Sequence, residues 1–229
     1  MQGVNLGHVI RKLLLSLGIL SSLWYIVINI VTPAFFPGYD IASQTISELS
    51  AIDAPSRVIW ERLAAFYSVF VILFGIGVWQ SPAANKPLKL VSVLLILFGI
   101  SGFFWPPMHL REVLAAGGKS ITDTLHIAMT FVTVILMTAL MIAGALALGR
   151  GFRFFSLGCL VLLYLFGILT ALESPGIEKN LPTPYIGIWE RINIGIFLVW
   201  VIYLAIVLIR RGEKPSTQQT RMRPMSMTT

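Results

Sequence analysis

The chain has 229 residues, of which 56% are hydrophobic and only 12% are charged. Soluble domains carry about a quarter of their residues as charged side chains, so this composition excludes an ordinary soluble domain and indicates a membrane protein. The formal net charge of +7 would suggest a nucleic-acid-binding surface on a soluble fold. Here the basic residues stand at the ends of apolar stretches, where they act as topology signals, and we expect no nucleic-acid partner.

Six apolar stretches follow one another along the chain, each near the length of about 20 residues that a transmembrane helix needs. They cover residues 13–31, 63–79, 90–105, 125–148, 154–172 and 192–209. The sequence therefore predicts an all-α integral membrane bundle of six transmembrane helices over residues 13–209. Residues 1–12 are expected to form a cytoplasmic lead, and residues 210–229 a basic, disordered cytoplasmic tail.

The first stretch follows Arg11 and Lys12, a pattern that also describes a signal peptide. The stretch is longer than a usual signal-peptide core, and no Ala-x-Ala cleavage site follows it. We therefore expect a retained first helix. Glycines within the later stretches, Gly75, Gly77, Gly99, Gly102 and Gly144, predict close approach between helices.

The distribution of basic residues predicts the orientation in the membrane. Eleven of the 17 Lys and Arg residues lie in residues 1–12, 80–89, 149–153 and 210–229. The other three loops hold the remaining six basic residues and nine of the ten acidic residues. Because loops rich in Lys and Arg stay in the cytoplasm, both termini are expected to be cytoplasmic, in the plasma (inner) membrane.

An internal similarity suggests that the bundle consists of three helical hairpins. The sequence Ile-Trp-Glu-Arg occurs at residues 59–62, before the second stretch, and again at residues 188–191, before the sixth. Parallel hairpin repeats place their outer loops together at one face. We therefore expect the three acid-rich loops to lie side by side.

The longest polar interval, residues 39–62, lies between the first two stretches. Thr45 and Glu48 fit a capping box, which predicts a short interfacial helix over residues 46–52. Ile46, Leu49 and Ile52 recur every three residues and would form one apolar face. We expect this segment to fold back over the outer mouth of the bundle, with Glu48 near a basic residue or histidine. A second capping box, residues 120–123, precedes the fourth stretch.

No charged residue lies in the middle of an apolar stretch, which disfavours an ion-coupled transporter. The polar residues at depth, Asn29 and Asn193, are expected to form hydrogen bonds between helices. The candidate site is instead an outward polar cluster: Tyr39, Asp40, Ser47, Glu48, Glu61, Arg62, His109, Arg111, Asp123, His126, Glu190 and Arg191.

Two interpretations of this cluster stay open. The favoured one is a buried network of ion pairs and hydrogen bonds that holds the outer loops on the bundle. In the other, Glu48, His109, Asp123 and His126 form a nitrogen and oxygen site of the kind that zinc accepts. These four are weak metal candidates, because acidic residues in a first turn are already favoured by the helix dipole. We expect no cofactor, and we assign no metal ligand and no catalytic residue.

The segments Tyr39-Asp40 and Ile46-Ser47-Glu48-Leu49, with Asp123, His126 and Glu190-Arg191, resemble the bacterial and archaeal membrane family catalogued as domain of unknown function 998. The resemblance covers about residues 13–209. It implies six spans and a plasma-membrane location, and it implies no established activity.

Three functions remain after these observations. The favoured one is a non-enzymatic membrane protein with an acidic outward-facing site for a lipid headgroup, a small amphiphile or a partner. The alternatives are a metal-dependent membrane hydrolase acting at the outer leaflet and a small transporter. Membrane lipids are the expected partners, and a protein partner or a homo-oligomer stays open.

Overall fold

A computed structural model describes residues 6–82 and 84–212 of the chain. Six helices in this part are long and apolar enough to cross a membrane. They are α1 (Leu6–Val31), α2 (Arg57–Trp79), α3 (Lys86–Ser101), α5 (Ile121–Ala147), α6 (Arg150–Glu173) and α8 (Ile186–Gly212). The prediction of an all-α membrane bundle with six spans is confirmed.

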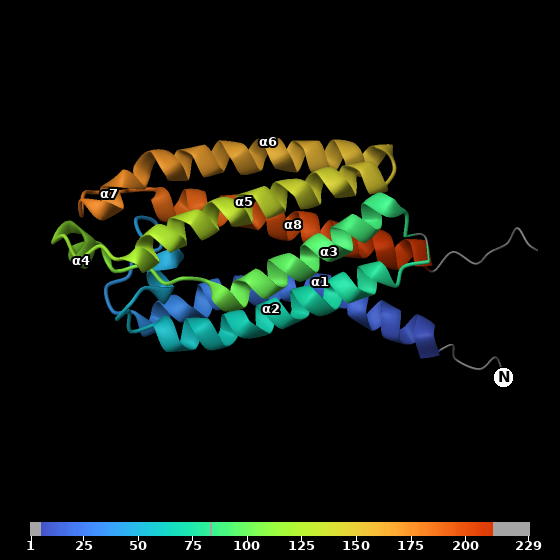
Figure 1. The fold of residues 1–229 in the computed structure, drawn as a ribbon, viewed down its shortest axis with the longest axis horizontal. Coiled ribbons are helices and arrows are strands. Elements are labelled where there is room, and N and C mark those ends of the chain that lie inside the picture. The colour runs from blue at the N-terminus through green and yellow to red at the C-terminus, as the bar shows by residue number, and fades with distance from the viewer. Residues whose placement is uncertain (1–5, 83, 213–229) are drawn as a thin grey trace, which may run out of the picture.

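Five short helical turns lie in the connections between the long helices. They are η1 (Thr32–Phe35), η2 (Ser47–Ser50), η3 (Gly102–Phe104), α4 (Arg111–Ala115) and α7 (Pro175–Glu178). All of them lie toward one end of the bundle, which we call the loop end. Both ends of the described chain lie at the opposite end, the terminal end (Figure 1).

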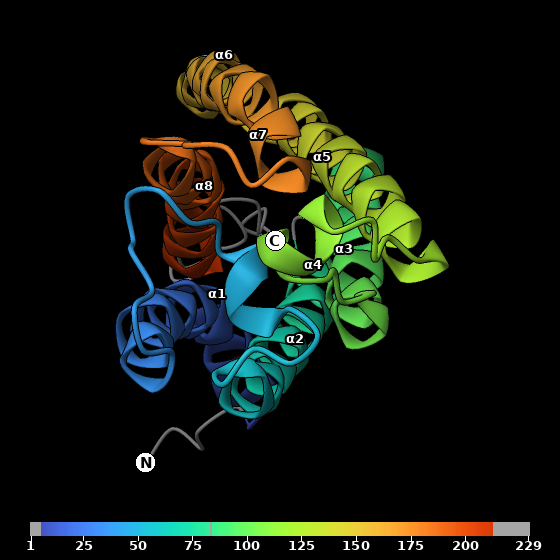
Figure 2. The same cartoon turned by 90° about the vertical axis from the view of Figure 1, so that its left-hand side faces the viewer.

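The six long helices form a closed ring. Each packs against the next one along the chain, and α8 packs against α1 (Figures 1 and 2). The hairpins α1–α2, α3–α5 and α6–α8 are therefore neighbours, but α2 also packs closely on α3, and α5 on α6. Short connections between antiparallel helices favour this up-and-down arrangement. As predicted, the three acid-rich loops meet at the loop end.

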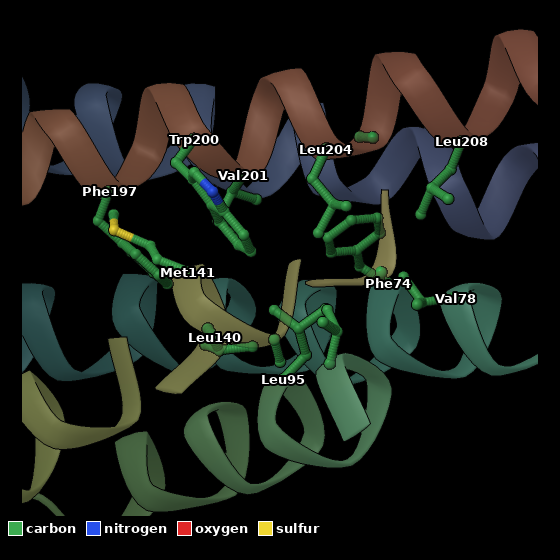
Figure 3. Close-up of a cluster of buried hydrophobic side chains, with 14 of the residues drawn as sticks. Phe74, Val78, Leu95, Leu140, Met141, Phe197, Trp200, Val201, Leu204 and Leu208 are labelled. Atoms are coloured by element: carbon green, nitrogen blue, oxygen red, sulfur yellow. The ribbon is translucent and has the colours of Figure 1, made fainter. Parts of the chain in front are cut away.

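The terminal half of the ring is filled by a hydrophobic core (Figure 3). Phe74 from α2, Leu140 from α5, and Trp200 and Leu204 from α8 are completely buried there. The expected close helix contacts are present: a Cβ on Gly99 would lie 2.7 Å from Ile72 Cγ1 and 2.9 Å from the Ser68 carbonyl oxygen. The buried side chains of this half form one continuous apolar cluster.

All six long helices begin before the predicted apolar stretches, and α6 and α8 also end beyond them. The first helix begins at Leu6 rather than residue 13, and the last one continues to Gly212. Apolar residues mark only the part of a helix inside the bilayer, whereas backbone hydrogen bonds carry the helix beyond it. The remainder of the predicted lead and tail, residues 1–5 and 213–229, lies outside the described residues.

Candidate functional site

Residues 39–56, which we call the lid, cross the mouth of the ring at the loop end (Figure 2). Ile46 and Leu49 are buried in a cluster with Ile28 and Trp60. Ile52 is half-buried, and its N–H donates to the Met108 carbonyl at 2.7 Å. The prediction that this segment folds back over the bundle is confirmed.

The helix within the lid is shorter and tighter than predicted. It is the 3₁₀ turn η2, over four residues, rather than a helix over residues 46–52. The predicted reciprocal bonds are present: the Thr45 N–H donates to Glu48 Oε2 at 2.8 Å, and the Glu48 N–H donates to Thr45 Oγ1 at 3.3 Å. The turn ends early because the Ile52 N–H bonds Met108, and because Asp53 adopts a left-handed conformation with φ of 64°.

Glu48 and Arg111 form a buried ion pair at the centre of the lid. Arg111 Nε lies 2.8 Å from Glu48 Oε1, and Arg111 Nη2 lies 2.9 Å from Glu48 Oε2. Glu48 is completely buried, and the Arg111 side chain is 11% exposed. Two parallel bonds of this kind fix both position and orientation. The predicted partner of Glu48 is therefore a basic residue from the second outer loop.

Arg111 also connects all three loops of the loop end. Its Nη2 donates to the Ser43 carbonyl at 3.1 Å, and its Nη1 donates to Thr183 Oγ1 at 3.3 Å. Thr183 in turn donates to the same Ser43 carbonyl at 2.8 Å. The hydrogen bonds that Arg111 donates to Glu48 raise the pKa of Arg111, so the guanidinium stays charged. This arrangement corresponds to the favoured network interpretation.

Arg191 holds the first part of the lid against α8. Its Nη1 donates to the Ile41 carbonyl at 2.9 Å, and its Nη2 donates to the Tyr39 hydroxyl at 2.6 Å. Tyr39 then donates to the Thr45 carbonyl at 2.7 Å. Burial raises the pKa of the Tyr39 phenol, so its hydroxyl remains a donor. The Arg191 guanidinium therefore donates to backbone carbonyls of the lid. Among the described ion pairs, none includes Arg191.

Gly187, one turn before Arg191, allows the lid to lie directly on α8. Its N–H donates to the Ala42 carbonyl at 2.9 Å. A Cβ at this position would lie only 2.2 Å from the Gln44 carbonyl oxygen and 2.3 Å from that of Ile41. Only glycine fits under a backbone that approaches so closely.

The two loop-end histidines belong to separate contacts. His126 is buried, with its Nδ1 2.7 Å from the Pro106 carbonyl oxygen and its Nε2 3.1 Å from Ser47 Oγ. A carbonyl only accepts, so Nδ1 carries the hydrogen, and in the neutral ring Nε2 accepts from Ser47. His109 Nδ1 lies 2.9 Å from Asp123 Oδ2.

Of the four weak metal candidates, His109 and Asp123 contact each other, whereas Glu48 and His126 are bonded to other residues. Asp123 forms the predicted capping box with Ser120 and also accepts the His109 N–H. Glu48 is occupied by Arg111, and His126 by Ser47 and Pro106. Within residues 6–82 and 84–212, no group of three His, Cys, Asp or Glu side chains is placed to hold a metal ion.

The remaining predicted residues lie outside this network. Asp40 closes its own turn: the Ser43 hydroxyl and the Ala42 N–H donate to its carboxylate, and these bonds lower its pKa. Glu61 is exposed and pairs with Arg57 at 2.8 Å. Arg62 is exposed on the same helix.

A cavity of about 580 Å³ lies beneath the lid, inside the loop half of the ring. A volume of this size is in the range of small-molecule sites. Ser47 and Ser50 of η2 form its roof, and Ser68 and Val134, near the middles of α2 and α5, lie at its depth. Phe98 and Met137 belong both to its lining and to the core that closes it below.

The cavity is partly open toward one side of the bundle. Its lining includes four exposed residues, Glu61, Gly102, Phe103 and Thr130, which lie on α2, η3 and α5. The exposed members of a lining mark where it meets the surroundings. The opening therefore lies laterally, between α5 and the pair α2 and η3, where a membrane-dissolved molecule would reach it.

Glu190 connects the lid to this cavity. It accepts the Ile46 N–H with Oε2 and also lines the cavity. Asn193, one turn further along α8, lines the cavity too and donates to the Leu163 carbonyl on α6. The expectation of an interhelical bond is confirmed for Asn193. It is wrong for Asn29, which donates within its own helix to the Tyr25 carbonyl.

Several participants were not predicted as site residues. Ser43, Gln44 and Thr183 take part in the loop network, and Tyr25 and Tyr67 line the cavity. No pattern in the sequence distinguishes these residues from ordinary loop or helix residues. Their roles follow from which segments meet at the loop end.

A family model described as "Protein of unknown function (DUF998)" matches residues 19–207. The match covers α2, α3, α5 and α6 completely, half of α1 and most of α8, and so includes the lid and the whole cavity. Searches of curated proteins and of solved structures give no significant match.

Proposed function

The chain belongs to the DUF998 family of proteins of unknown function, and from its fold as a six-span membrane protein we propose that it binds an amphiphilic molecule beneath the lid without transforming it. The amphiphile is a lipid headgroup with its chain, or a smaller molecule of the same build. Membrane lipids are the expected partners of the protein.

The shape of the cavity carries this proposal. Ser47, Ser50 and Glu190 line its lid end, whereas the apolar side chains of Phe98, Val134 and Met137, together with Ser68, line its deeper part. Its opening is lateral and lies among Gly102, Phe103 and Thr130. A ligand with a polar head and an apolar body matches both the polarity gradient and the side entrance.

The orientation follows from the charge distribution. We place the loop end outside the cytoplasm and both termini inside, in the plasma membrane, because basic residues are concentrated at the terminal end. In this orientation the lid covers a cavity in the outer half of the bilayer. The amphiphile would then come from the outer leaflet.

The test compares two bulky substitutions in protein purified from membranes. Ala64 lines the cavity, whereas Ala128 is exposed on α5 and does not. We expect Ala64→Trp to remove a lipid that native mass spectrometry finds on the unmodified chain, and Ala128→Trp to retain it. Equal lipid retention by both variants would contradict binding in this cavity.

A transporter is the second candidate, because the cavity reaches the middles of α2 and α5 at Ser68 and Val134. Alternating access would require the core around Phe74, Leu140 and Trp200 to open toward the terminal end. Liposomes holding the protein and a fluorescent lipid distinguish the two functions. A binding protein leaves the transbilayer rate at that of empty liposomes, whereas a lipid transporter increases it.

A further inference from the structure

Resting on the proposed amphiphile binding, we propose that the cavity selects a ligand whose head is a cationic ammonium group, with quaternary ammonium as the best fit. Three observations carry this inference: the sign of the charges in the lining, the aromatic walls and the position of Glu190. None of them depends on the family to which the chain belongs.

The charged residues of the lining are all acidic. Glu61 and Glu190 line the cavity, and no Lys, Arg or His is among the described lining residues. Arg57 pairs with Glu61 and compensates its charge, so Glu190 is the lining acid that determines the sign of the field. Of the other nearby cations, Arg111 pairs with Glu48 and Arg191 donates to the lid backbone. The field inside the cavity therefore favours a cation and disfavours a phosphate or carboxylate head.

Glu190 is the deeper of the two acids and has the greater effect on a ligand. One of its carboxylate oxygens accepts the Ile46 N–H. Within the described structure, no basic side chain lies within ion-pair distance of the carboxylate. An ammonium group in the cavity would supply the missing positive charge, and an opposite charge within about 4–6 Å favours the ionised carboxylate.

Aromatic side chains form much of the wall around this position. Tyr25 packs edge-on against Trp60, with ring centroids 6.0 Å apart, and its ring lies 4.9 Å from that of Tyr67. Trp105 and Phe103 also belong to the lining, and Phe103 is exposed. Cations are attracted to the faces of such rings, and quaternary ammonium groups are characteristically bound by several aromatic rings with a carboxylate nearby.

The lateral opening provides space for the apolar chain of the ligand. A dodecyl or longer chain attached to the ammonium head would leave the cavity past Phe103 and Thr130 into the bilayer. The shared chemistry is therefore an alkylammonium group. A membrane amphiphile and a small soluble quaternary ammonium compound are its two possible sources.

Photolabelling of the full chain in lipid nanodiscs tests this selectivity. Three probes share one dodecyl chain with a diazirine and differ only in the head: trimethylammonium, maltoside or sulfate. Mass spectrometry quantifies labelling of cavity peptides around Thr130 and Met137, relative to the outward-facing residues Val161 and Leu165 of α6. This internal reference corrects for different partitioning into the bilayer.

We expect the trimethylammonium probe to label the cavity on the order of tenfold more than the maltoside probe, and the sulfate probe least. Glu190→Gln keeps an oxygen to accept the Ile46 N–H and should remove the preference for the trimethylammonium probe over the maltoside probe. The matched control is Glu178→Gln on α7, an exposed residue paired with Lys119, which should keep the preference.

The outcomes separate this inference from the proposed function. Equal cavity labelling by all three heads, or a preference that survives in Glu190→Gln, would overturn ammonium selectivity while leaving amphiphile binding intact. Cavity labelling no stronger than that of the α6 surface, and unchanged in Ala64→Trp, would contradict amphiphile binding itself. Excess choline distinguishes the two sources. If choline reduces cavity labelling by the trimethylammonium probe, the ligand is a soluble quaternary ammonium compound. If choline leaves the labelling unchanged, the ligand is a membrane amphiphile.

Discussion

At the scale of single residues, the loop end depends on charges that are almost fully satisfied by neighbours. Glu48 accepts two bonds from Arg111 and two from Thr45. Placing two ions out of water is costly, and removing one of them leaves the other uncompensated. The Glu48–Arg111 pair therefore determines how the loops meet. Loss of either residue is expected to destabilise the lid more than other single changes in it.

Arg111→Ala is expected to destabilise the protein by about 3–5 kcal/mol, because it leaves the buried Glu48 carboxylate without its cation. The effect would appear as a lower apparent melting temperature in detergent. Arg62→Ala removes an exposed arginine from α2 and serves as the control. Its effect should stay within about 0.5 kcal/mol. Similar melting temperatures for the two variants would show that the buried pair contributes little.

Ser47 and His126 have the spacing of a nucleophile and its general base, with the Pro106 carbonyl orienting the imidazole. We interpret the contact as a structural hydrogen bond that holds the lid on α5. Ser47 should accordingly not react with a fluorophosphonate probe, and Ser47→Ala should lower stability by about 1 kcal/mol. Covalent labelling of Ser47 that is lost in His126→Gln would instead identify a serine hydrolase.

At the scale of elements, similar sequences at the starts of α2 and α8 have different roles. Glu190 and Arg191 contact the lid, whereas Glu61 and Arg62 are exposed. The difference arises because residues 41–46 of the lid bond Glu190 and Arg191 on α8, whereas the lid packs on the start of α2 through Trp60. Close contact between the lid and α8 requires glycine at position 187, where the backbone of residues 41–44 passes.

Gly187→Ala should displace the lid, because the added Cβ would overlap the Gln44 and Ile41 carbonyl oxygens. We expect faster proteolysis within residues 39–56 and a lower melting temperature. Gly195→Ala in the same helix is a matched control, since no atom lies within 4 Å of its added Cβ. This control should be neutral or stabilising by up to about 1 kcal/mol. A lid unaffected by Gly187→Ala would mean that the backbone can move away at little cost.

At the scale of the whole molecule, the ring has two unlike halves. The terminal half is a continuous apolar core, and the loop half encloses a cavity under a polar lid. This asymmetry places the cavity at the loop end of the described structure. The function therefore depends on which side of the membrane the loop end faces.

Cysteine labelling on a Cys159→Ser background tests the proposed orientation. The native thiol is buried in the bundle and is the chain's one cysteine. Cysteines at Gln44, Lys119 and Lys179 should react with an impermeant reagent on intact cells, whereas those at Lys86 and Gly151 should react only after lysis. Reaction of Gly151→Cys from outside would reverse the orientation and place the lid in the cytoplasm.

The sequence by itself determined the class of the protein, the six spans and the lid. Runs of apolar residues identify membrane helices because the bilayer fixes their length and polarity. The periodicity of Ile46 and Leu49, with the Thr45–Glu48 capping pattern, predicted a lid packed on the bundle. These features depend on neighbours in the chain.

Only the tertiary structure decided which polar residues meet and where the space between them lies. Arg111 pairs with Glu48 across 63 positions, and Glu190 reaches Ile46 across 144. The cavity exists because six helices close into a ring whose loop half is not filled by side chains. Which side chains bond each other, and the shape of the cavity, are set by packing between segments that are distant in the chain. Residue types and their spacing along the chain do not reveal these contacts.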